Sequence, residues 1–98
     1  MEVEFSDESL LLLESNDDSA GRWSVEIVNG FRKALRVIRS ALDERDFRAM
    51  RSLNFEKLDG DRSGQYSLRI NRQWRLIVEI REGNPKNTIV VKEIVDYH

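Results

Sequence analysis

Two arginines in the second half of the chain have the spacing of residues that could bind phosphate. Residues 66–70 and 74–81 alternate apolar and polar side chains, which predicts two neighbouring strands with Arg69 and Arg75 on their polar face. Residues that share a face can be neighbours across a hairpin. Guanidinium groups bind phosphate oxygens through two parallel hydrogen bonds. This face therefore carries side chains that suit a phosphate-bearing ligand.

The last residues of the sequence add a group that transfers protons. Asp96, Tyr97 and His98 directly follow an apolar segment, so the predicted last strand would hold His98 in place. Imidazole gives and takes protons near neutral pH. Arginines and a histidine suit RNA cleavage: a 2′-hydroxyl attacks the adjacent phosphate, arginines stabilise the added charge, and an acid protonates the departing 5′-oxygen. A Ser-His-Asp hydrolase is disfavoured because no serine lies in a nucleophile-elbow sequence.

The same residues also have an interpretation without chemistry. An antiparallel sheet commonly exposes one polar face to water, and its arginines would then pair with acids such as Asp59, Asp61 and Glu79. A histidine at a chain end is commonly frayed and chemically idle. The residue pattern alone leaves both interpretations open.

The composition excludes several other kinds of site. The 98 residues are expected to form a single domain over 1–98. They include no cysteine and one histidine, which excludes a disulfide framework and a Cys-based or His-rich zinc site, so we expect no metal and no cofactor. No apolar run approaches the roughly 20 residues that span a bilayer. We therefore expect a cytoplasmic protein with no membrane partner.

The charges are distributed unevenly along the chain. The net charge is −2, but the first 20 residues contain seven of the 18 acids and no Lys or Arg. The other 78 residues therefore hold 11 acids and all 16 Lys and Arg, a net charge of +5. Local patches create the field that a ligand meets, so a nucleic-acid partner is compatible with the acidic whole-chain pI of 5.4. Mixed charges that merely solvate a small domain explain the same numbers.

The first half of the chain predicts two to three helices after a short strand. Residues 1–5 alternate acidic and apolar side chains as a strand does, and Ser6 is expected to cap a helix that carries Leu10, Leu11 and Leu13. A second helix is predicted from an apolar stripe with spacings of three and four, formed by Trp23, Ile27, Phe31, Leu35, Ile38 and Leu42. Residues 43–52 add one or two further helical turns.

The second half of the chain predicts three successive strands. They are expected at 66–70, 74–81 and 88–97, with a turn at 71–73 and a loop at 83–87 where Gly83 and Pro85 interrupt strand pairing. This order predicts an α+β fold, in which a small antiparallel-rich β-sheet is packed on one face by two to three N-terminal helices.

Two blocks of the sequence resemble a known family. Residues 58–76 read LDGDRSGQYSLRINRQWRL, which is similar to the central L-K-G-D-R-x-G-Q-[WYH]-S-I-R-I-N-x-Q-W-R-[IL] block of HigB-type toxins in the RelE superfamily. Residues 93–98 read EIVDYH and resemble the family's terminal V-E-I-V-D-Y-H. The two blocks cover about a quarter of the chain, in the family's order.

The resemblance implies a RelE-like fold and a toxin of a type II toxin–antitoxin system. Such toxins are metal-independent endoribonucleases that cleave mRNA on the ribosome and inhibit translation, and a HigA-like helix-turn-helix antitoxin silences them. The carried-over catalytic residues are Arg69 and Arg75 at the phosphate, Tyr97 to orient or stack on the substrate, and His98 as the acid–base group. The residues expected to bind RNA are Lys57, Arg62 and Arg72. Arg62 is also suited to a structural pairing with Asp61, and Trp74 is expected in the core.

One departure from the family pattern matters, because it keeps two alternative functions open. Asp59 stands where the family has lysine, which reverses the charge where RNA phosphates are expected. Lys57, two residues earlier, would share a strand face with position 59 and is the candidate to replace that lysine. The alternatives are a non-enzymatic ParE-type inhibitor of a protein such as gyrase, and an attenuated toxin that acts mainly as antitoxin partner and corepressor.

Overall fold

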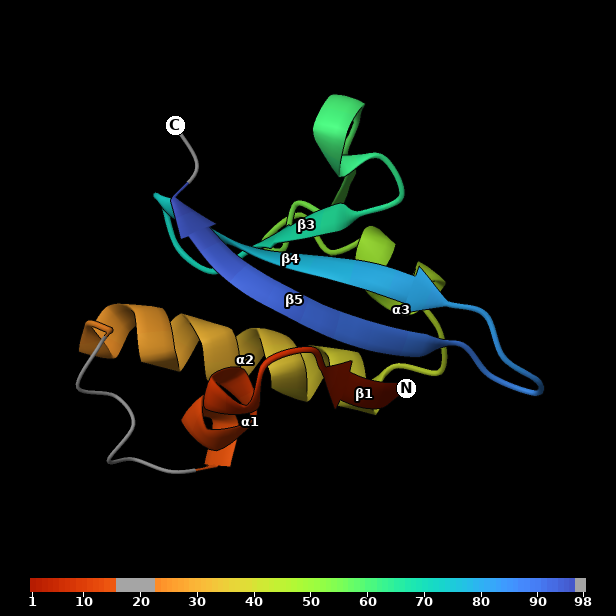
Figure 1. Ribbon diagram of the computed structural model, residues 1–98, viewed down its shortest axis with the longest axis horizontal. Coiled ribbons are helices and arrows are strands. Elements are labelled where there is room, and N and C mark those ends of the chain that lie inside the picture. The colour runs from red at the N-terminus through yellow and green to blue at the C-terminus, as the bar shows by residue number, and fades with distance from the viewer. Residues whose placement is uncertain (16–22, 97–98) are drawn as a thin grey trace.

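The computed structural model describes residues 1–15 and 23–96, which form a five-stranded sheet with helices on one face (Figure 1). In chain order the elements are β1 (Glu2–Phe5), α1 (Glu8–Ser15), α2 (Val25–Ser40), α3 (Arg45–Arg48), β2 (Glu56–Lys57), the 3-10 turn η2 (Gly60–Arg62), β3 (Tyr66–Arg69), β4 (Trp74–Arg81) and β5 (Thr88–Asp96). The predicted α+β class is confirmed.

The sheet has the strand order β1-β5-β4-β3-β2. Strands β3 to β5 are the three predicted strands, and β2 adds a fourth to their antiparallel meander. Strand β1 pairs in parallel with β5, which makes the sheet mixed. The register between β4 and β5 shifts between Ile77 and Val78, where the opposite residues change from Glu93 to Val91 and Lys92 is left as an extra residue. Such a bulge bends the strand and increases its twist.

Helix α2 forms because its apolar residues make one continuous stripe that the sheet can bury. Ser24 caps it by accepting a hydrogen bond from the Ile27 backbone N–H at 3.3 Å. The predicted stripe extended too far at its end, since α2 stops at Ser40 and Leu42 is 69% exposed. None of the helices within residues 1–15 and 23–96 has the length and apolarity to cross a membrane.

Helix α1 lies against α2 and is held there by arginines beside the apolar stripe. Arg32 donates from Nε and Nη2 to the Leu13 carbonyl at 3.0 and 2.9 Å, and Arg39 makes a two-point ion pair with Glu14. The hydrogen bonds that Arg39 donates to the Glu14 carboxylate raise the pKa of Arg39. The prediction that Ser6 caps α1 is wrong: Asp7 accepts from the Ser9 N–H, and the Ser6 hydroxyl donates to the Val91 carbonyl instead.

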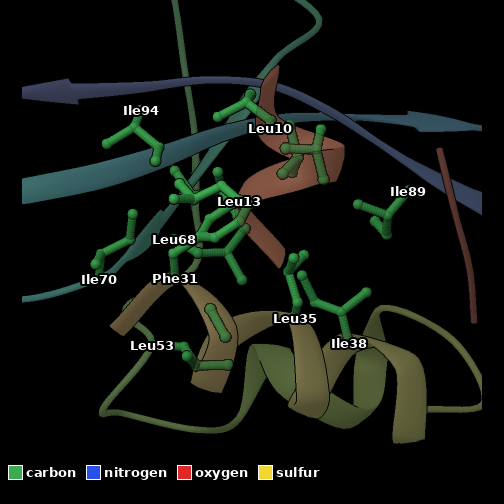
Figure 2. Packing of buried hydrophobic residues seen from close by; sticks show 14 of the residues in the cluster. Leu10, Leu13, Phe31, Leu35, Ile38, Leu53, Leu68, Ile70, Ile89 and Ile94 are labelled. Carbon is green, nitrogen blue, oxygen red and sulfur yellow. The ribbon is translucent and has the colours of Figure 1, made fainter. Parts of the chain in front are cut away.

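The core fills the space between the helices and one face of the sheet (Figure 2). Its central residues from α2 and the sheet are fully buried and come from both halves of the chain: Phe31, Leu35, Ile38, Leu68, Leu76, Val78, Ile89 and Val91. Because side chains alternate along a strand, the residues between these point to the opposite face. We call that opposite side the outer face; α1 and α2 lie on the other side of the sheet (Figure 1).

Gly30 lets α2 approach the turn that joins β3 to β4. A Cβ atom at this position would lie 2.4 Å from the Ile70 carbonyl oxygen and 2.5 Å from the Ile70 Cγ2. Because the Ile70 carbonyl belongs to the backbone, such a clash could be relieved only by moving the helix or the turn. The helix therefore fixes the position of the turn between Arg69 and Arg75.

We expect Gly30→Ala to lower the free energy of unfolding by about 1–2 kcal/mol, since overpacking outweighs the better helix propensity of alanine. Chemical unfolding followed by circular dichroism measures it. Asn29→Ala is the matched control, because Asn29 is exposed on the same helix and meets no such obstacle. Equal or higher stability of Gly30→Ala would contradict the close approach.

Candidate functional site

The sheet brings Arg69 and Arg75 together on the outer face. They are directly opposite each other across the β3–β4 hairpin, and their sequence neighbours Leu68 and Leu76 are fully buried on the core side. The predicted placement of both arginines on the face away from the helices is therefore confirmed. Two guanidinium groups in this arrangement concentrate positive charge at one place on the outer face.

Arg75 is buried, with 4% of its surface exposed, and its Nε and Nη2 groups bind other parts of the protein. Its Nη2 lies 2.7 Å from the Ser67 hydroxyl oxygen and 2.5 Å from the Asn54 carbonyl oxygen, and Nε lies 3.2 Å from the same hydroxyl. The Glu56 carboxylate is 3.8 Å away. The guanidinium is a fixed positive charge whose Nε and Nη2 donors already bind protein groups.

Arg69 differs because its side chain is exposed. Its Nε donates to the Asn71 carbonyl at 3.2 Å, and Arg72 in the following turn is exposed as well. Within the part of the chain that the structure describes, neither Arg69 nor Arg72 has an ion-pair partner. These two cations are available to an anionic ligand.

The turn that carries Arg72 is well ordered by side chains. The Asn71 Oδ1 accepts from the backbone N–H groups of Gln73 and Trp74 at 2.9 and 2.8 Å, as in an Asx turn. The Gln73 amide in turn donates to the Asp96 carboxylate at 2.9 Å. This hydrogen bond ties the turn to the end of β5.

Arg62 reaches the outer face from the η2 segment, drawn in green above the sheet in Figure 1. It donates to Glu93 at 2.8 Å and to the Gln65 side chain at 3.1 Å, and Gln65 donates to Glu79. The expected pairing with Asp61 is not among the contacts of the described residues. Glu93 and Glu56, rather than Asp59 and Asp61, are the acids that pair with the arginines of this face.

Lys57 lies on the other face of the sheet. It pairs with Tyr66, whereas Glu56 pairs with Ser67, and Ser67 shares a face with Arg69. Lys57 therefore does not lie beside Arg69 and Arg75. The strand also ends at Lys57, before Asp59, so the alternation that would relate these two positions does not continue.

Glu56 is a charged residue of the outer face that the sequence analysis did not identify. Its side chain is 41% exposed, and its carboxylate faces Arg75. A carboxylate beside fixed positive charge can accept a proton from a bound hydroxyl group. Strand β2 has only two residues, so no period-two pattern marks the direction of Glu56 in the sequence.

The surroundings of the chain end are described up to Asp96. Asp96 lies opposite Trp74, which is half-buried against the core and packs edge-on against Trp23 at 5.5 Å between ring centroids. The core assignment of Trp74 is confirmed. Tyr97 and His98, the other two predicted catalytic residues, lie outside the described residues.

Two other features of the face complete its electrostatics. Glu4 on β1 pairs with Arg81 on β4, and β1 is three strands away from β3, which carries Arg69, so the described acids of β1 lie at the far edge of the sheet. Within residues 1–15 and 23–96, no group of three His, Asp or Glu side chains gathers closely enough to hold a metal ion.

Comparison with known proteins places the chain in a family. The model of the RelE-like toxin HigB of type II toxin–antitoxin systems matches residues 3–98. The chain belongs to the HigB-like toxin family. Toxin HigB-1 of Vibrio cholerae serotype O1 (strain ATCC 39315 / El Tor Inaba N16961) is 32% identical over 88 residues, which are 90% of this chain and 93% of that protein.

Solved structures of related toxins share the fold of this HigB-like toxin. A YoeB/ParE toxin from Agrobacterium tumefaciens superposes with a TM-score of 0.67 at 16% identity, over 100% of both chains. A chain of the YoeB-YefM complex from Staphylococcus aureus superposes with a TM-score of 0.63 at 20% identity, over 100% of this chain and 97% of that one. At these identities the likeness shows the fold alone.

We expect Arg75→Ala to lower the free energy of unfolding of the HigB-like toxin by about 3 kcal/mol, because it leaves Ser67 and the Asn54 carbonyl without their partner. Arg69→Ala should change it by less than about 0.5 kcal/mol, since Arg69 is exposed. Urea unfolding followed by tryptophan fluorescence measures both. Equal effects of the two substitutions would contradict the distinction between a buried, fixed arginine and an exposed one.

Proposed function

We propose that this HigB-like toxin is a metal-independent endoribonuclease that cleaves mRNA on the ribosome and so inhibits translation. The observation that supports this is the position of the opposed Arg69 and Arg75 on the outer face. They lie at the end of the sheet where Asp96, hydrogen-bonded to Gln73, leads into Tyr97 and His98. Arginines, a carboxylate and a histidine suit phosphodiester cleavage.

In the proposed reaction the 2′-hydroxyl attacks the adjacent phosphorus. The new O2′–P bond forms as the P–O5′ bond breaks, which leaves a 2′,3′-cyclic phosphate and a 5′-hydroxyl. Glu56 takes the proton of the 2′-hydroxyl, and His98 gives a proton to the departing 5′-oxygen. Arg69 binds the phosphate, and the fixed charge of Arg75 stabilises the transition state without reorganising. Tyr97 orients the substrate, and Arg72 is a further RNA-binding residue, whereas Arg62 is held by Glu93.

We also propose the partners that this function requires. Silencing would come from a HigA-like helix-turn-helix antitoxin, and membership in a type II toxin family supports an antitoxin partner. The heterotetrameric complex of the YoeB-YefM toxin-antitoxin from Staphylococcus aureus is a structure of the same fold that contains an antitoxin. Action on translating ribosomes would place the protein in the cytoplasm.

We expect induced expression in a bacterial host to arrest growth and to produce new mRNA 5′ ends at ribosome-occupied codons. His98→Ala and Arg69→Ala should reduce cleavage by about 10²–10³-fold, the usual effect of removing one stabilising or proton-transferring group. Mapping 5′ ends by sequencing measures this. Lys33→Ala, an exposed change of the same sign on α2, is the control and should cleave normally.

The same experiment separates the alternatives. Growth arrest without new 5′ ends would contradict the nuclease and favour a ParE-type inhibitor of a protein target. No arrest by the wild-type chain would favour an attenuated toxin that acts as antitoxin partner and corepressor, as the acidic Asp59 suggests.

We expect Glu56→Gln to slow cleavage by about 10²–10⁴-fold, because the amide keeps the shape of the side chain but accepts no proton. Single-turnover cleavage of ribosome-bound mRNA is the appropriate measurement. Glu79→Gln is the matched control, since Glu79 lies on the same face and contacts Gln65 and Lys92 rather than Arg75. An unchanged rate in Glu56→Gln would remove Glu56 from the mechanism.

A further inference from the structure

A second feature that suits RNA lies on the opposite side of the sheet from the two arginines. An open cavity of about 410 Å³ is lined by Arg48, Phe55, Lys57 and Tyr66, beside the edge strand β2. Lys57 and Tyr66 are directly paired across β2 and β3 and so share a face of the sheet. Arg48 comes from the last turn of α3.

The aromatic residues of this cavity form a stack. The Phe55 and Tyr66 rings are nearly parallel, with an interplanar angle of 6° and 5.0 Å between centroids. The Arg48 guanidinium carbon lies 5.6 Å from the centre of the Phe55 ring, and the buried Phe47 supports that ring edge-on. The core therefore holds a planar stack in place at the rim of the cavity.

The charged residues of the cavity are both positive. Arg48 and Lys57 are exposed, and neither has an ion pair or side-chain hydrogen bond to another residue within 1–15 and 23–96. The acid next to Lys57 in sequence, Glu56, is directed to the outer face. Two cations beside a stack of flat groups make a site that attracts a flat, anionic ligand.

We propose that this cavity is a nucleotide subsite for single-stranded RNA. A base continues the stack of Tyr66, Phe55 and Arg48, while Lys57 and Arg48 bind the flanking phosphates. An acidic peptide would pair with the two cations, but its carboxylates would not stack on the parallel rings, whereas an RNA base would. RNA is therefore favoured. The proposal rests on the proposed function only in taking RNA as the ligand, and it concerns binding rather than cleavage.

Strand β2 lies between the subsite and the outer face. It is the last strand of the sheet, and its two residues point to opposite sides, Glu56 toward Arg75 and Lys57 into the cavity. A single strand of RNA can pass around this exposed edge from one face to the other. The subsite would then hold RNA next to the segment that is cleaved.

The first experiment measures binding without cleavage. A fluorescent single-stranded RNA whose 2′-hydroxyls are methylated cannot undergo the attack, and fluorescence anisotropy at several salt concentrations gives its Kd. We expect Arg48→Ala/Lys57→Ala to weaken binding and to reduce the slope of log K against log salt by about 1.4, or about 0.7 for each phosphate that is no longer neutralised. The matched control is Lys33→Ala/Arg36→Ala, which removes the same charge from the surface of α2.

The stack is tested by a different signature. Tyr66→Leu keeps an apolar side chain against the core and should raise the Kd by about five- to tenfold while leaving the salt slope unchanged. Circular dichroism of each variant separates loss of the subsite from loss of the fold.

Sedimentation with ribosomes distinguishes the two possible sources of the RNA, ribosomal RNA and mRNA. If the double variant no longer binds ribosomes that carry no mRNA, the subsite binds ribosomal RNA. If the double variant binds those ribosomes normally and loses binding only to ribosomes that carry mRNA, the subsite binds the mRNA.

Equal effects of the two double variants on Kd and salt slope would overturn the subsite, as would a wild-type chain that does not bind the RNA. Unchanged RNA binding with weakened antitoxin binding would overturn it in favour of a peptide surface. If wild type binds RNA through these residues but produces no cleavage in cells, the subsite stands and the proposed nuclease function fails.

Discussion

The buried guanidinium of Arg75 is the interaction on which the region around the site depends. Removing a charge from water is costly unless hydrogen-bonding partners replace the water. Those partners come from three segments: Ser67 on β3, Asn54 in the preceding loop, and Glu56 on β2. The Arg75 side chain therefore holds β2 against the sheet, although β2 pairs with β3 through only two residue pairs.

The same interaction sets both faces of β2. Asn54 has a positive φ of 43°, a conformation that asparagine adopts more readily than most residues, and its carbonyl accepts from Arg75. The chain direction after this turn places Phe55 and Lys57 on the core side and Glu56 on the outer side. The two arginines thus differ in role: Arg75 holds the short strand in position, and the exposed Arg69 opposite it is accessible to a ligand.

The sequence predicted well the elements whose side chains repeat, and poorly those that do not. Alternation over several residues was enough to place β3, β4 and β5, and to put Arg69 and Arg75 on the same face. The stripe of α2 was found, but its end was not, because Leu42 fits the spacing and yet follows Ser40, where the helix stops. The side of Lys57 and the position of Glu56 depend on a two-residue strand, and the burial of Arg75 depends on groups that are distant in sequence.

The placement of the charged residues changes the expected effect of Asp59 on RNA binding. Asp59 is exposed at the start of η2, and Arg62 at the end of the same turn is already paired with Glu93, so this segment offers little positive charge to a phosphate. Among residues 1–15 and 23–96, cations without an ion pair lie on either side of it: Arg69 and Arg72 at the hairpin turn, Arg48 and Lys57 beyond the edge strand. Because a polyanion follows positive charge, its path on this toxin would pass along the hairpin turn and around β2 rather than across the η2 turn. In that case a change of path, and not a neighbouring residue on the same strand face, would compensate for the absence of the family's lysine.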